Sequence, residues 1–105
     1  MAKADKRVQI VERNGEFFAE PGSLELDGNQ TLKIVNRTDE DLLWVVANAS
    51  VFGAPVAETV QSKKLSTLQK VPANPPAGIY EYQILMLKSG KSAKGNSNPA
   101  IIIDS

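Results

Sequence analysis

The chain has 105 residues, and its twelve basic side chains balance twelve acidic ones. It contains neither histidine nor cysteine, which excludes a cysteine nucleophile, a histidine base, a structural zinc site and a blue-copper centre. A neutral chain lacks the electrostatic footprint of a nucleic-acid-binding protein. Its longest apolar run, residues 42–47, is far shorter than the ~20 residues of a membrane span. We therefore expect no nucleic-acid partner and no membrane insertion.

The first part of the chain has the pattern of short strands separated by turns. Residues 8–11 are rich in β-branched side chains and lead towards Asn14-Gly15, a dipeptide that favours a hairpin turn. Residues 23–26 and 31–35 alternate apolar and polar side chains, which is typical of strands with one buried face.

The most apolar segment, residues 42–47, has apolar side chains on both faces, and this pattern predicts a central strand. Leu42, Trp44 and Val46 share one predicted face. In a two-layer sandwich only one face of a strand meets the core. The other face must then be covered by residues 48–64, by a partner or by a second copy of the chain.

The second half of the chain contains a connection, a strand, a loop and a final strand. We expect residues 48–64 to form a long connection with a short helical turn near 56–60. Alternate residues of the predicted strand at 79–86 are apolar and face the core, namely Tyr80, Tyr82, Ile84 and Met86. The Gly-, Ser- and Lys-rich residues 88–98 predict a mobile loop, and residues 101–103 a last strand.

The number and spacing of these elements predict the fold class. About seven short strands, with turn signals roughly every 8–12 residues, are typical of an all-β Greek-key β-sandwich. We expect one domain over residues 1–105, in which residues 1–6 form a flexible tail.

The order of several motifs resembles the cupredoxin family. An aromatic residue and a proline precede an alternating strand, a glycine turn and a strand that ends in asparagine, and the matching residues are Phe18, Pro21, Leu24, Leu26, Gly28, Leu32, Ile34 and Asn36. Residues 76–82 are similar to the family's Pro-x-Gly-x-Tyr-x-Tyr approach to its copper-binding loop, and residues 99–104 to its closing strand. The resemblance implies a cupredoxin-like fold. Residues 93–104 also resemble the tail of small bacterial cupredoxin-like or immunoglobulin-like β-sandwich proteins that end in a Pro-x-Ile-Ile-type strand.

The resemblance does not extend to the copper ligands. Cupredoxins place a histidine shortly after the strand-ending asparagine, where this chain has residues 41–44, and a cysteine after Tyr-x-Tyr, where it has Ile84. The second histidine and the methionine match residues 85–88. Met86 is the one candidate ligand left, and we expect it to pack in the core, because a lone thioether is a weak ligand. We therefore expect no copper and no other cofactor.

Three lysines, Lys88, Lys91 and Lys94, recur at every third position of one predicted loop. They would lie at the end of the molecule where a cupredoxin holds copper, together with residues 38–43 and 85–98. We propose this end as a first candidate interaction surface, although the lysines also fit a solvated loop.

A second candidate interaction surface is the sheet face that carries Leu42 or Leu43 and Trp44. An uncovered apolar face usually marks an interface, and tryptophan is enriched at interface hot spots. The acidic residues 39–41 fit a solvated turn better than a calcium site, because their spacing matches no calcium loop.

These features favour a non-catalytic binding or interaction module over an enzyme. The partner would be another protein or a second copy of the chain. Two alternatives stay open, a structural or assembly subunit that forms a homo-oligomer and a small-molecule carrier. The start of the chain has no apolar leader, which fits a cytoplasmic protein, or a periplasmic or secreted one whose signal peptide has been removed.

Overall fold

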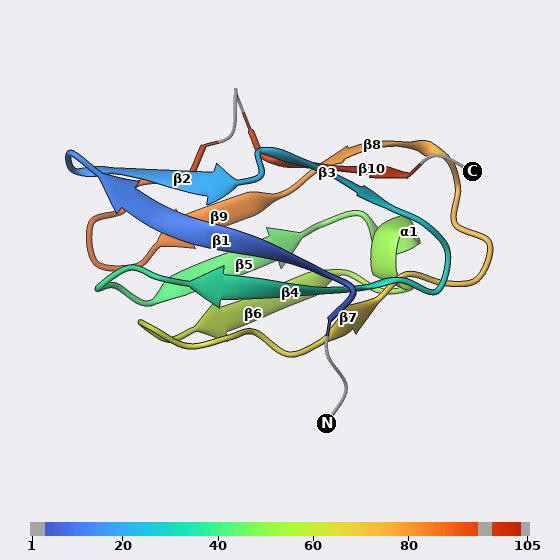
Figure 1. Ribbon diagram of the computed structural model, residues 1–105, viewed down its shortest axis with the longest axis horizontal. Coiled ribbons are helices and arrows are strands. Elements are labelled where there is room, and N and C mark those ends of the chain that lie inside the picture. Colours follow the sequence, from blue (N-terminus) through green and yellow to red (C-terminus); the bar gives the residue numbers. More distant parts are fainter. Residues whose placement is uncertain (1–3, 95–97, 104–105) are drawn as a thin grey trace.

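The computed structural model describes residues 4–94 and 98–103. Within these ranges the chain forms ten strands in three sheets and one helical turn, α1 (Ala49–Phe52), which confirms a nearly all-β fold (Figure 1). The strands are β1 (Lys6–Arg13), β2 (Glu16–Glu20), β3 (Ser23–Leu26), β4 (Thr31–Asn36), β5 (Leu42–Val46), β6 (Val56–Val60), β7 (Gln69–Lys70), β8 (Gly78–Glu81), β9 (Gln83–Met86) and β10 (Ala100–Ile103). No helix in the described ranges is long and apolar enough to cross a membrane.

The strands form two layers around an apolar core. One layer is the sheet with strand order β2-β1-β4-β7, which lies in front of β9, β5 and β6 in Figure 1. The other layer combines the sheets β3-β10-β8 and β6-β5-β9, and these are linked because Tyr82 alone separates β8 from β9. Leu32 and Ile34 of β4 are fully buried, as their alternation predicts.

The hairpin between β1 and β2 turns at Asn14-Gly15, as predicted. Asn14 and Gly15 have φ values of +53° and +79°. Asparagine and glycine adopt such left-handed conformations at lower cost than other residues, which explains why this dipeptide favours a two-residue hairpin turn. The register pairs Arg13 with Glu16 directly across the turn.

Residues 56–60 form the strand β6, so the predicted helical turn at this position is wrong. β6 pairs with β5, and Val56 and Val60 are buried. The helical turn lies earlier, as α1, where the Asn48 side chain accepts a hydrogen bond from Ser50 N at 2.8 Å. Pairing with a neighbouring strand decides between strand and turn for such a short segment, and its own residues do not.

The predicted strand at 79–86 is divided between two sheets. β8 pairs with β10, β9 pairs with β5, and the chain passes from one sheet to the other at Tyr82. The predicted inward face is confirmed for Tyr82, Ile84 and Met86, which are buried, whereas Tyr80 is half-buried and packs against the core. The alternation therefore continues through the change of sheet.

Residues 91–94 are extended chain and not part of a mobile loop, which corrects the prediction for 88–98. Ser92 pairs with Leu85 of β9, and Lys94 pairs with Phe18 of β2. The Lys94 amide donates to the Phe17 carbonyl oxygen at 3.0 Å. This segment therefore joins an edge of the second layer to an edge of the first, and residues 95–97 lie outside the described residues.

The predicted tail, residues 1–6, joins the fold in part. Lys6 is the first residue of β1 and pairs with Leu32 of β4. The Asp5 carboxylate accepts a hydrogen bond from Thr31 N at 2.9 Å. Residues 1–3 lie outside the described part of the chain.

Candidate interaction surface

Several of the positions at which the cupredoxin resemblance predicts copper ligands hold packed apolar side chains, whereas Leu85, Leu87 and Lys88 in the same stretch are exposed. Leu42 pairs with Met86, and Trp44 pairs with Ile84, across β5 and β9. All four side chains are buried in the core, which confirms the prediction for Met86. Blue copper needs a thiolate and imidazoles, which the sequence lacks, so the residues present do not fit that ion. In the part of the chain that the structure describes, no cluster of three or more acidic side chains has the arrangement of a metal site.

Trp44 lies inside the core and not on a surface. Its side chain is 0% exposed, and its ring packs edge-on against Phe52 of α1 with the ring centroids 6.0 Å apart. Leu42 is fully buried on the same face. The prediction that Leu42 and Trp44 reach a partner is therefore corrected, because the chain itself covers this face of β5.

Two polar atoms of this core have no hydrogen-bond partner among the described residues, Trp44 Nε1 and the Tyr82 hydroxyl. Burial raises the pKa of Tyr82 well above its ordinary value of about 10, because the ionised phenolate would be desolvated. Tyr82 is therefore neutral near pH 7 and is not suited to act as a base.

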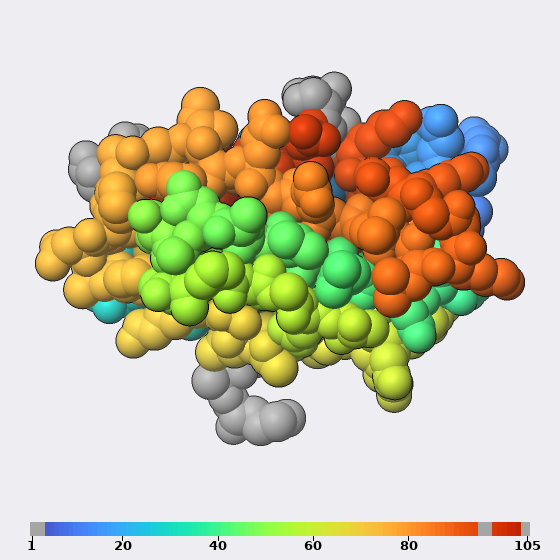
Figure 2. Space-filling view, turned by 180° about the vertical axis from the view of Figure 1, so that it is seen from behind, coloured from blue at the N-terminus to red at the C-terminus, as the bar shows by residue number. Residues whose placement is uncertain are grey.

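Leu43 and Val45 lie on the opposite side of β5 from Trp44 and are half-buried. The strand register places them in two rows that cross the sheet, Thr59–Leu43–Leu85–Ser92 and Ala57–Val45–Gln83. We call these seven residues the outer face. Leu85 is 38% exposed. The other four residues are also exposed, namely Ala57, Thr59, Gln83 and Ser92. Figure 2 shows the strands that hold the outer face side by side at the surface.

The outer face contains no charged residue, although charged residues make up 23% of the chain. Charged residues occur next to the outer face. Asp41 comes two residues before Leu43, and Glu81 comes two residues before Gln83. A sheet face in contact with water usually has polar residues at such positions. The outer face has four apolar residues among seven, of which Ala57 and Leu85 are exposed and Leu43 and Val45 half-buried.

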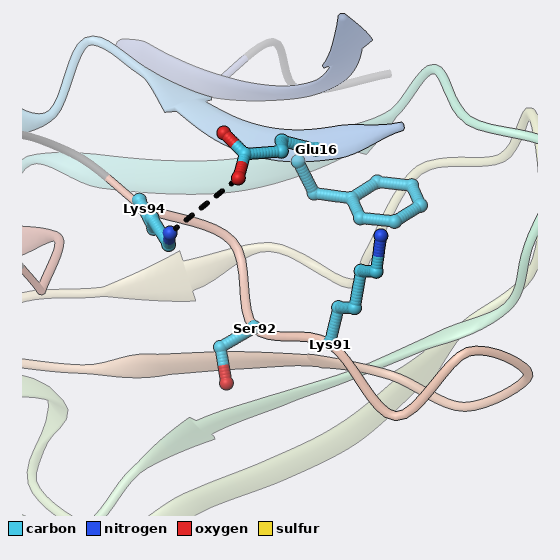
Figure 3. Close-up of a pocket in the computed structure, with 5 residues that line it drawn as sticks. Glu16, Lys91, Ser92 and Lys94 are labelled. Atoms are coloured by element: carbon cyan, nitrogen blue, oxygen red, sulfur yellow. Dashed lines mark ion pairs between the residues drawn. The ribbon is translucent and has the colours of Figure 1, made fainter. Parts of the chain in front are cut away.

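A pocket of about 280 Å³ lies beside the Ser92 end of the outer face, and its lining residues are Glu16, Phe17, Lys91, Ser92 and Lys94 (Figure 3). Lys91 Nζ donates to the Gly15 carbonyl oxygen at 2.6 Å, and Lys94 Nζ lies 3.9 Å from Glu16 Oε1. Both lysines therefore already have partners within the chain. The pocket presents both signs of charge and is not a purely basic site.

Lys88 lies elsewhere, at the end of the molecule where the resemblance places the copper loop. The Glu40 carboxylate accepts hydrogen bonds from Lys88 N at 3.1 Å and from Ser89 N at 2.8 Å. Asp41 Oδ1 accepts one from Ser62 N at 2.9 Å. Two carboxylates of the acidic turn thus hold neighbouring loops in place.

The six predicted site residues therefore do not form one surface. Leu42 and Trp44 are in the core, Leu43 is in the outer face, Lys91 and Lys94 line the pocket at its edge, and Lys88 belongs to the loops described above.

Sequence reasoning included Leu85 in residues 85–98 of the first candidate surface but did not place it beside Leu43, with which it pairs directly. The available signal was the outward series of the strand at 79–86, in which Leu85 follows the polar residues Glu81 and Gln83. Leu85 is apolar at an outward position, and residues 42–47 are apolar on both faces. Together these two features indicated that the two strands share an apolar patch.

No protein-family model matches the chain, and no curated protein matches it. Among solved structures, the chain is similar to amicyanin, a cupredoxin. The Cu(I) form of one amicyanin mutant superposes with a TM-score of 0.64 at 13% identity, over 99% of this chain and 86% of the amicyanin chain. An oxidised amicyanin mutant gives a TM-score of 0.63 over the same shares. At this identity the likeness establishes a cupredoxin-like β-sandwich fold and does not extend to function.

Proposed function

We propose that this chain is a non-catalytic protein-interaction module that binds its partner through the outer face. The observation behind the proposal is the uncharged, partly exposed row in which Leu43 and Leu85 lie side by side. Removing such apolar surface from water favours association.

The surroundings of the outer face support the same proposal. Protein interfaces combine an apolar centre, depleted of charge, with a polar rim. Here the centre comprises Leu43, Val45 and Leu85, and the pocket with Lys94 and Glu16 provides charged groups at one end. A partner seated on Leu85 and Ser92 would therefore also meet the lysines of the pocket.

A binding role also agrees with the loss of the usual chemistry from this fold. The chain has no histidine or cysteine, and the positions expected for copper ligands hold Leu42, Ile84 and Met86. We infer that a cupredoxin-like scaffold of this kind functions by binding a partner at its surface.

The test compares capture of partners by the wild-type chain with capture by Leu85→Lys. Leu85 is partly exposed, so the variant should fold while placing a charge in the apolar centre. Leu65→Lys is the matched control, because Leu65 is 47% exposed and pairs with Val35 in the other layer. We expect a partner that is lost with Leu85→Lys and kept with Leu65→Lys. Equal capture by both variants would contradict the proposal.

A further inference from the structure

We propose that the Glu58 side chain prevents the free edge of β6 from pairing with a strand of another chain. β6 is the last strand of its sheet and pairs with β5 alone among the described residues. An exposed strand edge is a template on which a further strand can add, and soluble proteins block such edges. The inference goes beyond the proposed function, because it concerns the backbone edge of β6 and not the side chains of the outer face.

The pairing pattern shows which way the backbone of β6 points. The Ile84 carbonyl oxygen accepts a hydrogen bond from Ala93 N at 2.9 Å, so the backbone of Ile84 points away from β5. Opposite residues of an antiparallel pair alternately exchange both backbone hydrogen bonds and none. Trp44, which is opposite Ile84, therefore directs its N–H and C=O towards β6 and exchanges hydrogen bonds with Glu58.

Two residues of β6 have backbone groups that point to the free edge. Because these directions alternate along a strand, Ala57 and Thr59, on either side of Glu58, direct their N–H and C=O groups away from β5. No other described residue forms a hydrogen bond with these groups. The edge therefore presents a row of unpaired backbone groups to which a further strand could bond.

The Glu58 side chain places a charge on the core side of this edge. Glu58 lies between the buried residues Val56 and Val60 and is itself half-buried. Its carboxylate accepts hydrogen bonds from Thr67 N and from Thr67 Oγ1, both at 2.7 Å. Thr67 precedes β7, the edge strand of the other layer, and Figure 1 shows β6 and β7 along the same edge of the molecule. The carboxylate is therefore held between the edges of the two layers.

A strand added to this edge would cover the carboxylate. Neighbouring strands lie about 4.8 Å apart, so a strand bonded to Ala57 and Thr59 would place its own side chains against Glu58. A groove of about 390 Å³ lies along the edge with Pro55, Glu58 and Thr67 among its lining residues, so the carboxylate faces solvent. Removing a carboxylate from water without a positive partner is costly, and inward-pointing charges are one means by which proteins block strand edges.

The test measures self-association of Glu58→Val, which replaces the charge with a side chain that strands favour. In sedimentation velocity we expect this variant to form species larger than the 11.3 kDa chain. It should do so at a concentration at least about tenfold below any at which the wild type associates. Glu58→Gln keeps the size of the side chain and removes its charge. It should act in the same direction, and it decides the proposal if Glu58→Val does not fold.

Thr67→Val is the matched control, because it removes a partner of the same contact and keeps the charge of Glu58. It should associate no more than the wild type. Adding Thr59→Pro to Glu58→Val should abolish the association, because proline has no N–H to donate at the free edge and removes no hydrogen bond with β5. Circular dichroism would verify that each variant is folded.

Three results would overturn the inference. The first is that folded Glu58 variants associate no more than the wild type. The second is that Thr67→Val associates as strongly as Glu58→Val, which would assign the effect to the lost contact and not to the charge. The third is that the association of Glu58→Val survives the addition of Thr59→Pro, which would place it away from the edge of β6.

Discussion

Trp44 is the largest side chain that is fully buried in the core. Its ring contacts Phe52, and its strand neighbours Leu42 and Val46 are buried on the same face. A residue in this position stabilises the sandwich and is not available to a partner. Any binding experiment that removes Trp44 would therefore measure unfolding as well as binding.

The Trp44→Ala variant should lose about 3–5 kcal/mol of unfolding free energy, the usual cost of truncating a buried aromatic residue to alanine. Urea denaturation followed by circular dichroism measures the loss. A decrease below about 1 kcal/mol would show that Trp44 is not packed as described.

Removing the Tyr82 hydroxyl should increase the stability of the fold, whereas truncating Trp44 should decrease it. The hydroxyl is buried and has no hydrogen-bond partner among the described residues. Tyr82→Phe removes this unsatisfied group while keeping the ring, so it should raise the free energy of unfolding by about 1 kcal/mol. Urea denaturation at pH 7 measures the change, and a clear loss of stability would show that the hydroxyl is hydrogen-bonded after all.

The same residue predicts a pH dependence. The pKa of Tyr82 is raised on folding above the ordinary value of about 10, so the folded state binds the phenolic proton more tightly than the unfolded chain does. The stability that comes from keeping Tyr82 protonated is fully present below pH ~10 and is lost as the pH rises above that value. The stability advantage of Tyr82→Phe over the wild type should therefore widen between about pH 9 and about pH 11. An advantage that stays constant over this range would contradict the assignment.

The turn after β4 depends on one buried amide, that of Asn36. Its Nδ2 donates to the carbonyl oxygens of Glu40 at 2.8 Å and Val60 at 3.0 Å. Its Oδ1 accepts from Thr38 N at 3.0 Å and from Thr38 Oγ1 at 2.7 Å. Asn36 therefore ties the end of β4 to β6 and to the acidic turn.

Replacing this amide should loosen both connections. Asn36→Ala leaves buried groups without partners, and we expect a loss of at least about 2 kcal/mol of unfolding free energy. Asn74→Ala, at an exposed loop position, is the control and should change the stability by less than about 0.5 kcal/mol. Similar losses for the two variants in urea denaturation would refute the role of Asn36.

Sequence reasoning was most successful where the pattern of apolar and polar residues within a strand shows which of its faces are buried. Alternation identified the buried faces of β4 and β9, and the apolar residues on both sides of β5 indicated a central strand. It failed for β6 and for residues 91–94, because these segments are extended through pairing with neighbouring strands, which their own residues do not reveal. For the candidate site it found Leu43 and the two pocket lysines, but it did not place Leu85 beside Leu43, because that neighbourhood depends on the register between β5 and β9.

The complete sandwich combines a fold similar to that of amicyanin with a composition that lacks the histidine and cysteine that blue copper needs. Leu42, Ile84 and Met86 extend the core into the region where the resemblance implies copper. The outer face lies on the other side of the same strands. The three-stranded sheet β6-β5-β9 thus provides both core contacts and the surface that we propose for binding.

The most direct test of this surface compares two-dimensional NMR spectra of the labelled wild-type chain with and without a protein that it captures. We expect backbone amide shifts to change on addition of that protein at Leu43, Val45, Leu85 and their row neighbours, and to remain constant in Leu85→Lys. Changes confined to the loops around Lys88, or no changes at all, would contradict the assignment of the outer face as the binding surface.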